Sequence, residues 1–520
     1  MDTDVLIVGA GPTGLMLANQ LARRGVRALI IDRHAGPALQ TRALGVHART
    51  LEIYAQLGIV ERAIELGKSA TGANIWARGR RAARVPLGET GRGATPYPYI
   101  LILGQDDNER IMGERLRDWG LSVQWNTELV ALVQQSDHVK ATLKGADGAR
   151  REIRAAWVAG CDGARSAVRD LNRIGFPGAA YEHVFFVADT EATGTMVSGE
   201  LNVYLWRRRF HLFFPMRGKD HWRIVGILPD ELTGREDLSL NDVLPTLRSE
   251  AGTGIAVTHC TWFSTYRIHH RAAASFRDRR CFLLGDAAHV HSPVGAQGMN
   301  TGLQDAYNLA WKLALVAGGR AEARLLDSYE EERVPVARRL LETTDRAFMV
   351  VVNDSWFVSL LRTHVIARVA AFALGLAPVR RTVFRIVSQI GIHYRGRTLS
   401  ESAPGLPRDA PRAGDRFPWL QLRFSAQGPL EDLFRKLDDL HFQLVVAGQP
   451  APAAGDLVKV HAIPSNAAND AELARARIPA TSYYLLRPDG HIGLCGVRFD
   501  AGVLAQYFAA RLGVERGGIR

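Results

Sequence analysis

The sequence of 520 residues predicts an α/β protein: a Rossmann-like domain interrupted by a mixed β-sheet, then a helical segment and a small α/β domain. Three observations predict this order. A buried strand, a glycine-rich turn and a helix open the chain at Val5–Gly14, and the same succession returns at Cys281–Asn300. Between them, residues 181–263 alternate as longer strands, which is typical of a sheet inserted into a nucleotide-binding domain.

The first domain is expected to begin with a β-α-β unit. Val5–Val8 is a continuous apolar run, as in a parallel strand that is buried on both faces. A helix is expected over Leu15–Arg24 and a second strand over Ala28–Ile31. The further strands expected in this domain and in the inserted sheet are Thr127–Gln134, Lys140–Leu143, Trp157–Ala159, Leu201–Trp206, Phe210–Pro215 and Trp222–Leu228.

The second half of the chain is expected to be mostly helical from Leu326 to about His393. Prolines and glycines between Pro404 and Gly414 then mark a linker. The last hundred residues show a compact α/β pattern, with a helix Leu430–Leu437, a strand Phe442–Val446, a hairpin at Arg487–Gly490 and a final helix Ala501–Arg511. The expected boundaries are a discontinuous first domain at 1–75, 103–180 and 275–345, a sheet domain at 76–102 and 181–274, a helical region at 346–400 and a C-terminal domain at 401–520.

Composition excludes several classes of function. The formal charge of +12 does not indicate nucleic-acid binding, because the basic residues are dispersed and dense basic blocks with interleaved aromatics are absent. The four cysteines form no CxxC, which argues against a disulfide scaffold, a metal site and a dithiol centre. A strand at residue 4 leaves no room for a secretory signal, and charges interrupt the apolar stretch Ala347–Ile392. We therefore expect a soluble, cytoplasmic protein without a membrane span.

The turn Gly9-Ala10-Gly11-Pro12-Thr13-Gly14 has the spacing of a dinucleotide-binding motif. Gly9 allows the tight turn, Gly11 lets a pyrophosphate approach the backbone, and Gly14 lets helix and strand pack closely. The amides at the start of the helix would face the phosphates. Asp32 ends the second strand and would accept hydrogen bonds from ribose hydroxyls. This motif alone does not distinguish FAD from NAD.

The second strand–turn–helix unit makes that distinction. The carboxylate of Asp286, directly after Gly285, can accept hydrogen bonds from a ribityl chain, which NAD lacks. The next helix would point its positive N-terminus, at Gln297-Gly298-Met299-Asn300, toward the pyrimidine edge of a flavin, which is anionic when reduced. Gly295 and Gly298 leave space for the ring. The sequence therefore predicts FAD, held at both ends by one domain.

A third turn, Cys161-Asp162-Gly163, also follows a strand. Asp162 is expected either to contact the cofactor, to contact a nicotinamide donor, or to cap the helix that follows. The residues leave these alternatives open.

Together the three turns resemble the class A flavoprotein aromatic hydroxylases, the family of para-hydroxybenzoate hydroxylase, phenol hydroxylase and the polyketide hydroxylases. The likeness covers roughly residues 3–345. It implies further cofactor contacts by Arg33, by Arg42 in a loop near the flavin, by Gln105 on the helix beside the ribityl phosphate, and by Val130 beside adenine. The tail, which has no CxxC, resembles the family's redox-inactive thioredoxin-like domain.

The resemblance also implies a reaction. NADH or NADPH reduces FAD, oxygen adds to give a flavin C4a-hydroperoxide, and the distal oxygen is transferred to a phenolic or polycyclic aromatic compound. The loop from Pro293 to Gly298 matches the segment that lines the flavin at this point, so Pro293 is a candidate catalytic residue. The protein has to exclude water, since an exposed hydroperoxide decays to hydrogen peroxide.

The substrate side is expected on the inserted sheet. Tyr204, Trp206, His211 and Phe213 lie on neighbouring strands that we expect to face the pocket. His211, and His47 in the flavin-side loop, are candidates to accept a phenolic proton and so raise the nucleophilicity of the ring. A structural role in the core is the alternative for each of them.

Other readings of the same pattern stay open. One is Baeyer–Villiger-type oxygen insertion on this fold, and another is a flavin-dependent dehydrogenase or reductase without oxygen transfer. Labelled-oxygen analysis of the product separates the first from hydroxylation, and substrate-stimulated oxygen uptake separates the second. The C-terminal domain is expected either to support a homodimer or to cover the active site.

Overall fold

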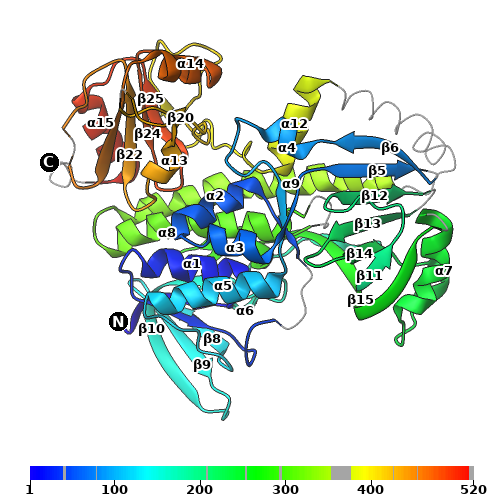
Figure 1. The fold of residues 1–520 in the computed structure, drawn as a ribbon. Coiled ribbons are helices and arrows are strands. Elements are labelled where there is room, and N and C mark those ends of the chain that lie inside the picture. Colours follow the sequence, from blue (N-terminus) through cyan, green and yellow to red (C-terminus); the bar gives the residue numbers. More distant parts are fainter. Residues whose placement is uncertain are drawn as a thin grey trace.

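The computed structural model describes residues 1–38, 43–77, 79–206, 209–251, 254–291, 296–352, 376–425, 427–453 and 455–514, with the backbone alone over 344–352. A nucleotide-binding sheet, an inserted sheet and a C-terminal α/β domain surround a group of central helices (Figure 1). The predicted α/β class with its Rossmann-like domain and inserted mixed sheet is confirmed. The domain boundaries stay predictions.

The first sheet has the order β16-β17-β10-β1-β2 and is extended by the hairpin β8–β9. Strands β17, β10, β1 and β2 are parallel neighbours. The bounds are β1 (Thr3–Val8), β2 (Ala28–Ile31), β8 (Glu128–Gln134), β9 (Val139–Lys144), β10 (Arg150–Gly160), β16 (Arg277–Asp278) and β17 (Cys281–Leu283). β10 begins well before the predicted Trp157, because its first half is polar and pairs with β9 at the edge, where no apolar run marks a strand.

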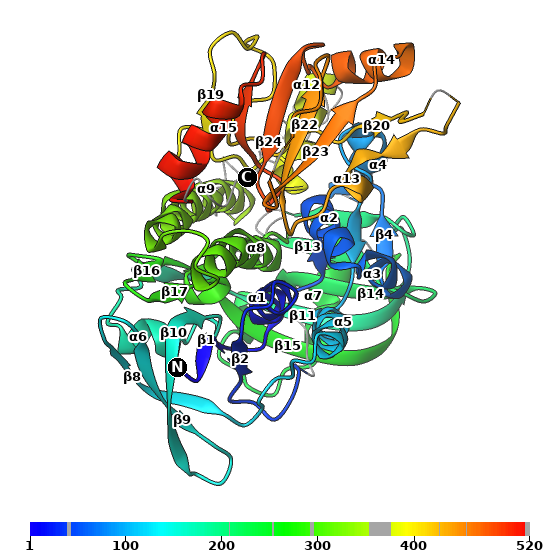
Figure 2. The ribbon, with the colours of Figure 1, turned by 90° about the vertical axis from the view of Figure 1, so that its left-hand side faces the viewer.

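Helices α1 (Pro12–Ala22), α5 (Gln105–Asp118) and α8 (Gly298–Ala317) pack side by side over this sheet (Figures 1 and 2). α1 begins earlier than predicted, since proline is well suited to the first turn of a helix. Beside them lies a small sheet with helices. Its elements are β3 (Gly45–Val46), α2 (Ala48–Leu57), α3 (Val60–Leu66), β4 (Lys68–Ala70) and β7 (Ile100–Ile102). The short helix α6 (Ala167–Leu171) packs on β8, β10 and β17 of the first sheet.

The inserted sheet has eight strands in the order β18-β15-β11-β14-β13-β12-β5-β6. Helix α7 (Leu240–Ala251) lies against its outer face, away from the first domain (Figure 1). The three predicted strands of this sheet are confirmed to within one residue at each end. The bounds are β5 (Ala73–Ala77), β6 (Arg80–Val85), β11 (Gly178–Thr193), β12 (Leu201–Leu205), β13 (Phe210–Pro215), β14 (His221–Ile227), β15 (Ala256–Ala272) and β18 (His289–Val290).

Beyond the first domain, a short 3-10 helix, η3 (Ala323–Leu326), leads into the long helix α9 (Asp327–Val352). Helix α12 (Ala377–Val387) packs on α4 (Leu87–Gly91). Part of the predicted helical region, 353–375, lies outside the described residues. Within the described residues no helix is both long and apolar enough to cross a membrane.

The C-terminal domain is built on a five-stranded sheet in the order β19-β25-β24-β22-β23. The predicted helix at 430–437 is shorter, because Glu431 and Asp432 pair with β20 (Gln421–Leu422) and the Asp432 carboxylate then caps α13 (Leu433–Lys436). The thioredoxin-like identity of this domain stays a prediction. The other bounds are β19 (Glu401–Ser402), β21 (Glu431–Asp432), β22 (Phe442–Ala447), β23 (Val458–Ile463), α14 (Ala467–Arg475), β24 (Ser482–Leu486), β25 (Ile492–Gly496) and α15 (Ala501–Tyr507), which continues as a π-helix to Leu512.

Candidate cofactor and active site

The three turns picked out in the sequence meet at one edge of the first sheet. β1, β10 and β17 are adjacent and parallel, so the turns at Gly9, Asp162 and Gly285 all leave from carboxyl ends of neighbouring strands. Backbone bonds lock the first two together, since Cys161 N donates to Val8 O at 2.7 Å. In open α/β sheets this edge is where nucleotide ligands bind.

The three glycines of the first turn have different structural roles. Gly9 has φ +103°, and a Cβ there would lie 2.4 Å from Cys161 O. A Cβ on Gly14 would lie 1.9 Å from Gly9 O, so α1 and β1 can touch only through glycine. A Cβ on Gly11 would meet no protein atom within 4 Å. Gly9 and Gly14 therefore serve the fold, while Gly11 faces open space that a ligand can use.

That open space is a cavity of about 690 Å³, within the usual size range of ligand sites. The turn Gly9–Gly11 forms one wall and the segment Asp32–Ala38 another. It is completed by Gln105, Glu109, Trp125, Thr127, Glu128, Leu129, Cys161, Asp162, Gly163, Arg165 and Ala167. The sequence-predicted Arg33 and Gln105 are brought into this cavity with the glycine turn. Val130 is not part of the lining, although its neighbour Leu129 is, and Val130 falls at a break in the β8–β9 register.

Asp32 is held at the cavity wall by backbone donors. Its Oδ2 accepts from Ala10 N at 2.7 Å, and its Oδ1 accepts from His34 N at 2.9 Å. On the opposite side Glu109 accepts from Ala38 N at 3.0 Å and from Gln105 Nε2 at 2.8 Å, and burial raises the pKa of the Glu109 carboxyl. These bonds fix the long loop after β2, and with it the wall that would meet an adenosine.

Asp162 gives a direct indication of a missing polar partner. Its Oδ2 accepts from Val168 N at 3.2 Å in the first turn of α6, whose N-cap residue is Ser166, so the choice among the three roles expected of Asp162 stays a prediction. Its Oδ1 is buried and has no hydrogen-bond partner among the described residues, and burial raises the pKa of the carboxyl. Buried polar atoms rarely stay unsatisfied in a native protein. A hydroxyl-bearing ligand in the cavity satisfies this atom, so the residues present fit FAD.

The flavin end of the site is formed by the Gly285–Asp286 turn. Gly285 has φ +57°, and Thr13 fills the space that a Cβ on Gly285 or on Gly302 would need, which brings α1, this turn and α8 together. Asp286 is exposed to solvent, and desolvation by the protein around it raises the pKa of its carboxyl. The carboxylate, just after the carboxyl end of β17, is therefore open to a ligand.

Sequence reasoning missed the residue that supports this turn. Asp305 on α8 is fully buried; its Oδ2 accepts from Gly285 N at 3.0 Å and lies 2.7 Å from His289 Nε2, and its Oδ1 accepts from Arg333 Nε at 2.6 Å. Burial raises the pKa of Asp305, but Arg333 and His289 outweigh burial and hold it below its ordinary value. A lone aspartate on the apolar face of a helix was the signal in the sequence.

The N-terminus of α8 is tied to the loop before α2. The Asn300 side chain accepts from His47 N at 2.9 Å and from Thr50 Oγ1 at 2.7 Å, and it donates to the carbonyl oxygens of Gly45 and Ala296. His47 is buried, with Nε2 3.0 Å from Ala296 O. The side chains of His47 and Asn300 therefore hold the loop before α2, and Asn300 has only its backbone left for a ligand. Next to it, Asn108 Nδ2 lies 3.2 Å from Met299 Sδ.

Three predicted site residues cannot be placed. Arg42, Pro293 and Gly295 lie outside the described residues, so their roles beside the flavin stay predictions. Gly298 opens α8 directly after that stretch. Among the residues that the structure covers, no group of three or more His, Cys, Asp and Glu side chains is arranged to hold a metal ion.

The predicted substrate residues lie on the face of the inserted sheet that α7 covers. Tyr204 and Phe213 are buried in a cluster with Val243 and Leu247 of α7. His211 is fully buried, with Nε2 2.9 Å from a carboxylate oxygen of Glu250 on the same helix. We expected this face to meet the pocket, and the structure instead packs it as core; Trp206, at the end of β12, is half-buried.

The opposite face of the inserted sheet meets the first domain. Leu201 and Phe214 pack against the core of that domain. Next to them Ile75, Val203 and Leu212 lie in register on three adjacent strands and are only half-buried. The turn at Asp286 continues into β18, which pairs with β15 of the same sheet. The half-buried apolar row and the strand that follows the Asp286 turn thus belong to the same sheet, with β15, β11 and β14 between them.

Comparison with known proteins gives a consistent picture. A family model described as FAD binding domain matches residues 2–344. The chain is 35% identical to the 6-methylpretetramide 4-monooxygenase of Streptomyces rimosus over 95% of this chain and 91% of that protein. It is 30% identical to the pentachlorophenol 4-monooxygenase of Sphingobium chlorophenolicum over 94% and 86%. The solved structure of OxyS anhydrotetracycline hydroxylase from Streptomyces rimosus superimposes with a TM-score of 0.78, at 28% identity and 99% coverage of both chains.

Proposed function

The chain belongs to the family of flavoproteins that share this FAD binding domain, and on that premise we propose that it hydroxylates a fused-ring phenolic compound held against the apolar face of its inserted sheet. The family fixes the class: an FAD-dependent aromatic monooxygenase that consumes NADH or NADPH and molecular oxygen. When FAD is bound, its flavin ring supplies the redox chemistry: it can accept a hydride from NADH or NADPH and react with molecular oxygen.

The chain's own residues bind and orient the cofactor in this proposal. The amides around Gly11 meet the pyrophosphate, Asp32 accepts from the ribose, and the unsatisfied oxygen of Asp162 accepts from a cofactor hydroxyl. Asp286 accepts from the ribityl chain at the other end. His47 and Asn300 act as anchors of the α8 N-terminus, whose positive end favours the reduced flavin.

The observation that carries the substrate class is the difference between the two faces of the inserted sheet. Along β5, β12 and β13, the side chains toward α7 are buried, and those of the other face are half-buried except for Phe210, which is buried at the start of β13. Ile75, Val203 and Leu212 form an apolar row across three strands, which spans about 10 Å. A flat, apolar wall of that width suits a planar fused-ring ligand, and it excludes water from the face of such a ligand.

Substrate-stimulated oxidation of NAD(P)H tests the activity. We expect fused-ring phenols to accelerate NAD(P)H and oxygen consumption by the holoenzyme, and mass spectrometry with labelled oxygen to find one labelled hydroxyl on the ring. Single-ring phenols, including chlorinated ones, form the comparison set. A lactone or ester product would support oxygen insertion instead, and no oxygen uptake with any aromatic would support a dehydrogenase.

A pair of variants tests the face. Leu212→Ala, on the half-buried face, is expected to raise KM for the aromatic substrate about fivefold, because apolar contact area is lost. Phe213→Leu, the adjacent residue on the α7 face, is expected to lower the melting temperature without a change in KM. A raised KM in Phe213→Leu together with an unchanged KM in Leu212→Ala would indicate that the substrate binds on the α7 side of the sheet.

A further inference from the structure

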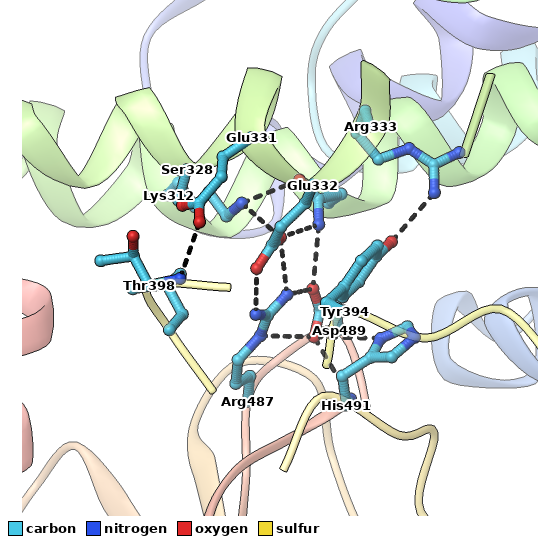
Figure 3. Close-up of polar contacts among 12 residues, drawn as sticks. Lys312, Ser328, Glu331, Glu332, Arg333, Tyr394, Thr398, Arg487, Asp489 and His491 are labelled. Atoms are coloured by element: carbon cyan, nitrogen blue, oxygen red, sulfur yellow. Dashed lines mark hydrogen bonds and ion pairs between the residues drawn. The ribbon is translucent and has the colours of Figure 1, made fainter. Parts of the chain in front are cut away.

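The residue that joins the Asp286 turn to the rest of the molecule is Arg333 on α9. Its guanidinium is fully buried and donates in three directions: Nε to Asp305 Oδ1 at 2.6 Å, Nη1 to Tyr394 Oη at 2.9 Å, and Nη2 to Thr301 O at 3.2 Å. Figure 3 shows the Tyr394 hydroxyl directed at Arg333 from the opposite side of the interface. The geometry of Arg333 therefore depends on a residue outside the nucleotide-binding domain.

Tyr394 is in turn fixed by the C-terminal domain. Its backbone N donates to Gly414 O at 2.7 Å, and its ring packs on the ring of His491 with centroids 4.3 Å apart. The guanidinium of Arg487 lies 5.2 Å from the centre of the same ring. Arg487 and His491 lie in the turn between β24 and β25, so this hairpin places two side chains against the Tyr394 ring (Figure 3).

Buried ion pairs lock the same hairpin to α8 and α9. Glu332 receives bonds from both Arg487 and Lys312, and Asp489 pairs with Arg487 (Figure 3). Three buried cations, Lys312, Arg333 and Arg487, thus balance three buried carboxylates, Asp305, Glu332 and Asp489. Removal of one partner from such a network leaves an uncompensated buried group, so the network holds its geometry only as a unit.

We propose that Arg333 is a positioning residue for the flavin end of the cofactor site, and that the C-terminal domain acts on the cofactor through Tyr394 and Arg333. The inference rests on the proposed placement of the ribityl chain against Asp286. Loss of the Tyr394 hydroxyl leaves a buried N–H of Arg333 unsatisfied and removes one of the three bonds that orient the guanidinium. The guanidinium is then held less firmly against Asp305, the residue that accepts from Gly285 N and lies beside His289. The cavity at the adenine end is lined by none of these residues.

Titration of apoproteins with FAD and with ADP tests this. ADP reports the adenine end alone. Tyr394→Phe is expected to weaken FAD binding about threefold to tenfold and to leave ADP binding unchanged, since a bond to a charged group is lost only at the flavin end. Tyr484→Phe is the matched control, because it removes a buried hydroxyl of the same domain that has no hydrogen-bond partner among the described residues; it should change neither affinity.

Arg333→Lys keeps the charge but loses the fork that reaches both Asp305 and Tyr394, so it should show the same pattern more strongly. FAD affinity unchanged in Tyr394→Phe, or equal losses for FAD and ADP, would overturn the proposal. The variant Asp286→Ala distinguishes failure of this proposal from failure of the proposed cofactor placement. If that variant binds FAD normally, the placement of the ribityl chain is wrong; if it loses FAD while Tyr394→Phe does not, only the role of Arg333 and Tyr394 is wrong.

Discussion

The two ends of the cofactor site are held in place by different physics. At the adenine end, Gly14 lets α1 pack against the turn at Gly9, and Gly9 lets that turn pack against the backbone of Cys161. At the flavin end, the Asp286 turn depends on Asp305 and Arg333, two buried side chains on separate helices. The first end is a matter of close packing and the second of buried charge, so substitutions, pH and distant contacts should affect them differently.

The largest effect is expected at the adenine end. Gly14→Ala places a Cβ 1.9 Å from Gly9 O, and backbone on both sides leaves no room to relax. We expect the free energy of unfolding to fall by more than about 4 kcal/mol, or the chain not to fold. Urea unfolding of the apoprotein measures this. A Gly14→Ala apoprotein as stable as the parent would mean that α1 and β1 do not pack as described.

Asp305→Asn should have the next largest effect, and it should depend on pH. Arg333 would keep a neutral partner in a buried position, which we expect to cost about 3 kcal/mol at pH 7. The pKa of Asp305 lies below its ordinary value, so its stabilisation is fully present above about pH 4 and is lost as pH falls through the lower, folded-state pKa. The difference in the free energy of unfolding between the parent and Asp305→Asn, measured with urea, should therefore become smaller below pH 4. A constant gap would show that the charge of Asp305 is not what stabilises the turn.

Gly11→Ala separates folding from binding at the adenine end. A Cβ there meets no protein atom, so the stability of the apoprotein should change by less than about 0.5 kcal/mol. The same methyl group intrudes on the pyrophosphate, and we expect FAD and ADP affinity to fall at least about tenfold, which corresponds to roughly 1.4 kcal/mol. Fluorescence titration with each ligand provides the measurement, with Gly14→Ala as the contrasting variant. If Gly11→Ala bound both ligands with the affinity of the parent, the pyrophosphate would not lie against this turn.

Asp32→Asn should have the smallest effect. The amide oxygen can still accept from Ala10 N, but the amide nitrogen cannot accept from His34 N, so the variant loses the charge and one of the two backbone bonds that hold this side chain. The affinities for FAD and for ADP should both fall by about threefold to fivefold. A loss confined to FAD would place Asp32 at the wrong end of the cofactor.

The sequence predicted that the three turns would meet, but it did not predict the side chains that support the Asp286 turn, and the reason is physical. Each of the three turns is a local pattern of strand, glycine and helix, and parallel strands bring such turns to one edge without further information. The pairing of Asp305 with Arg333 depends on how α8 and α9 pack, which no local pattern encodes. In the inserted sheet, alternation correctly grouped Tyr204 with Phe213 and His211, but it could not show that α7 covers that face.

The most direct measurement is the affinity of FAD relative to ADP in two apoprotein variants. Gly11→Ala should weaken both ligands by the same factor, because both place a pyrophosphate at the first turn. Asp286→Ala should leave ADP affinity unchanged and weaken FAD by at least about tenfold, because only FAD carries a ribityl chain. Equal losses for both ligands in Asp286→Ala, or undiminished FAD binding, would contradict a cofactor that spans the sheet edge from Gly11 to Asp286.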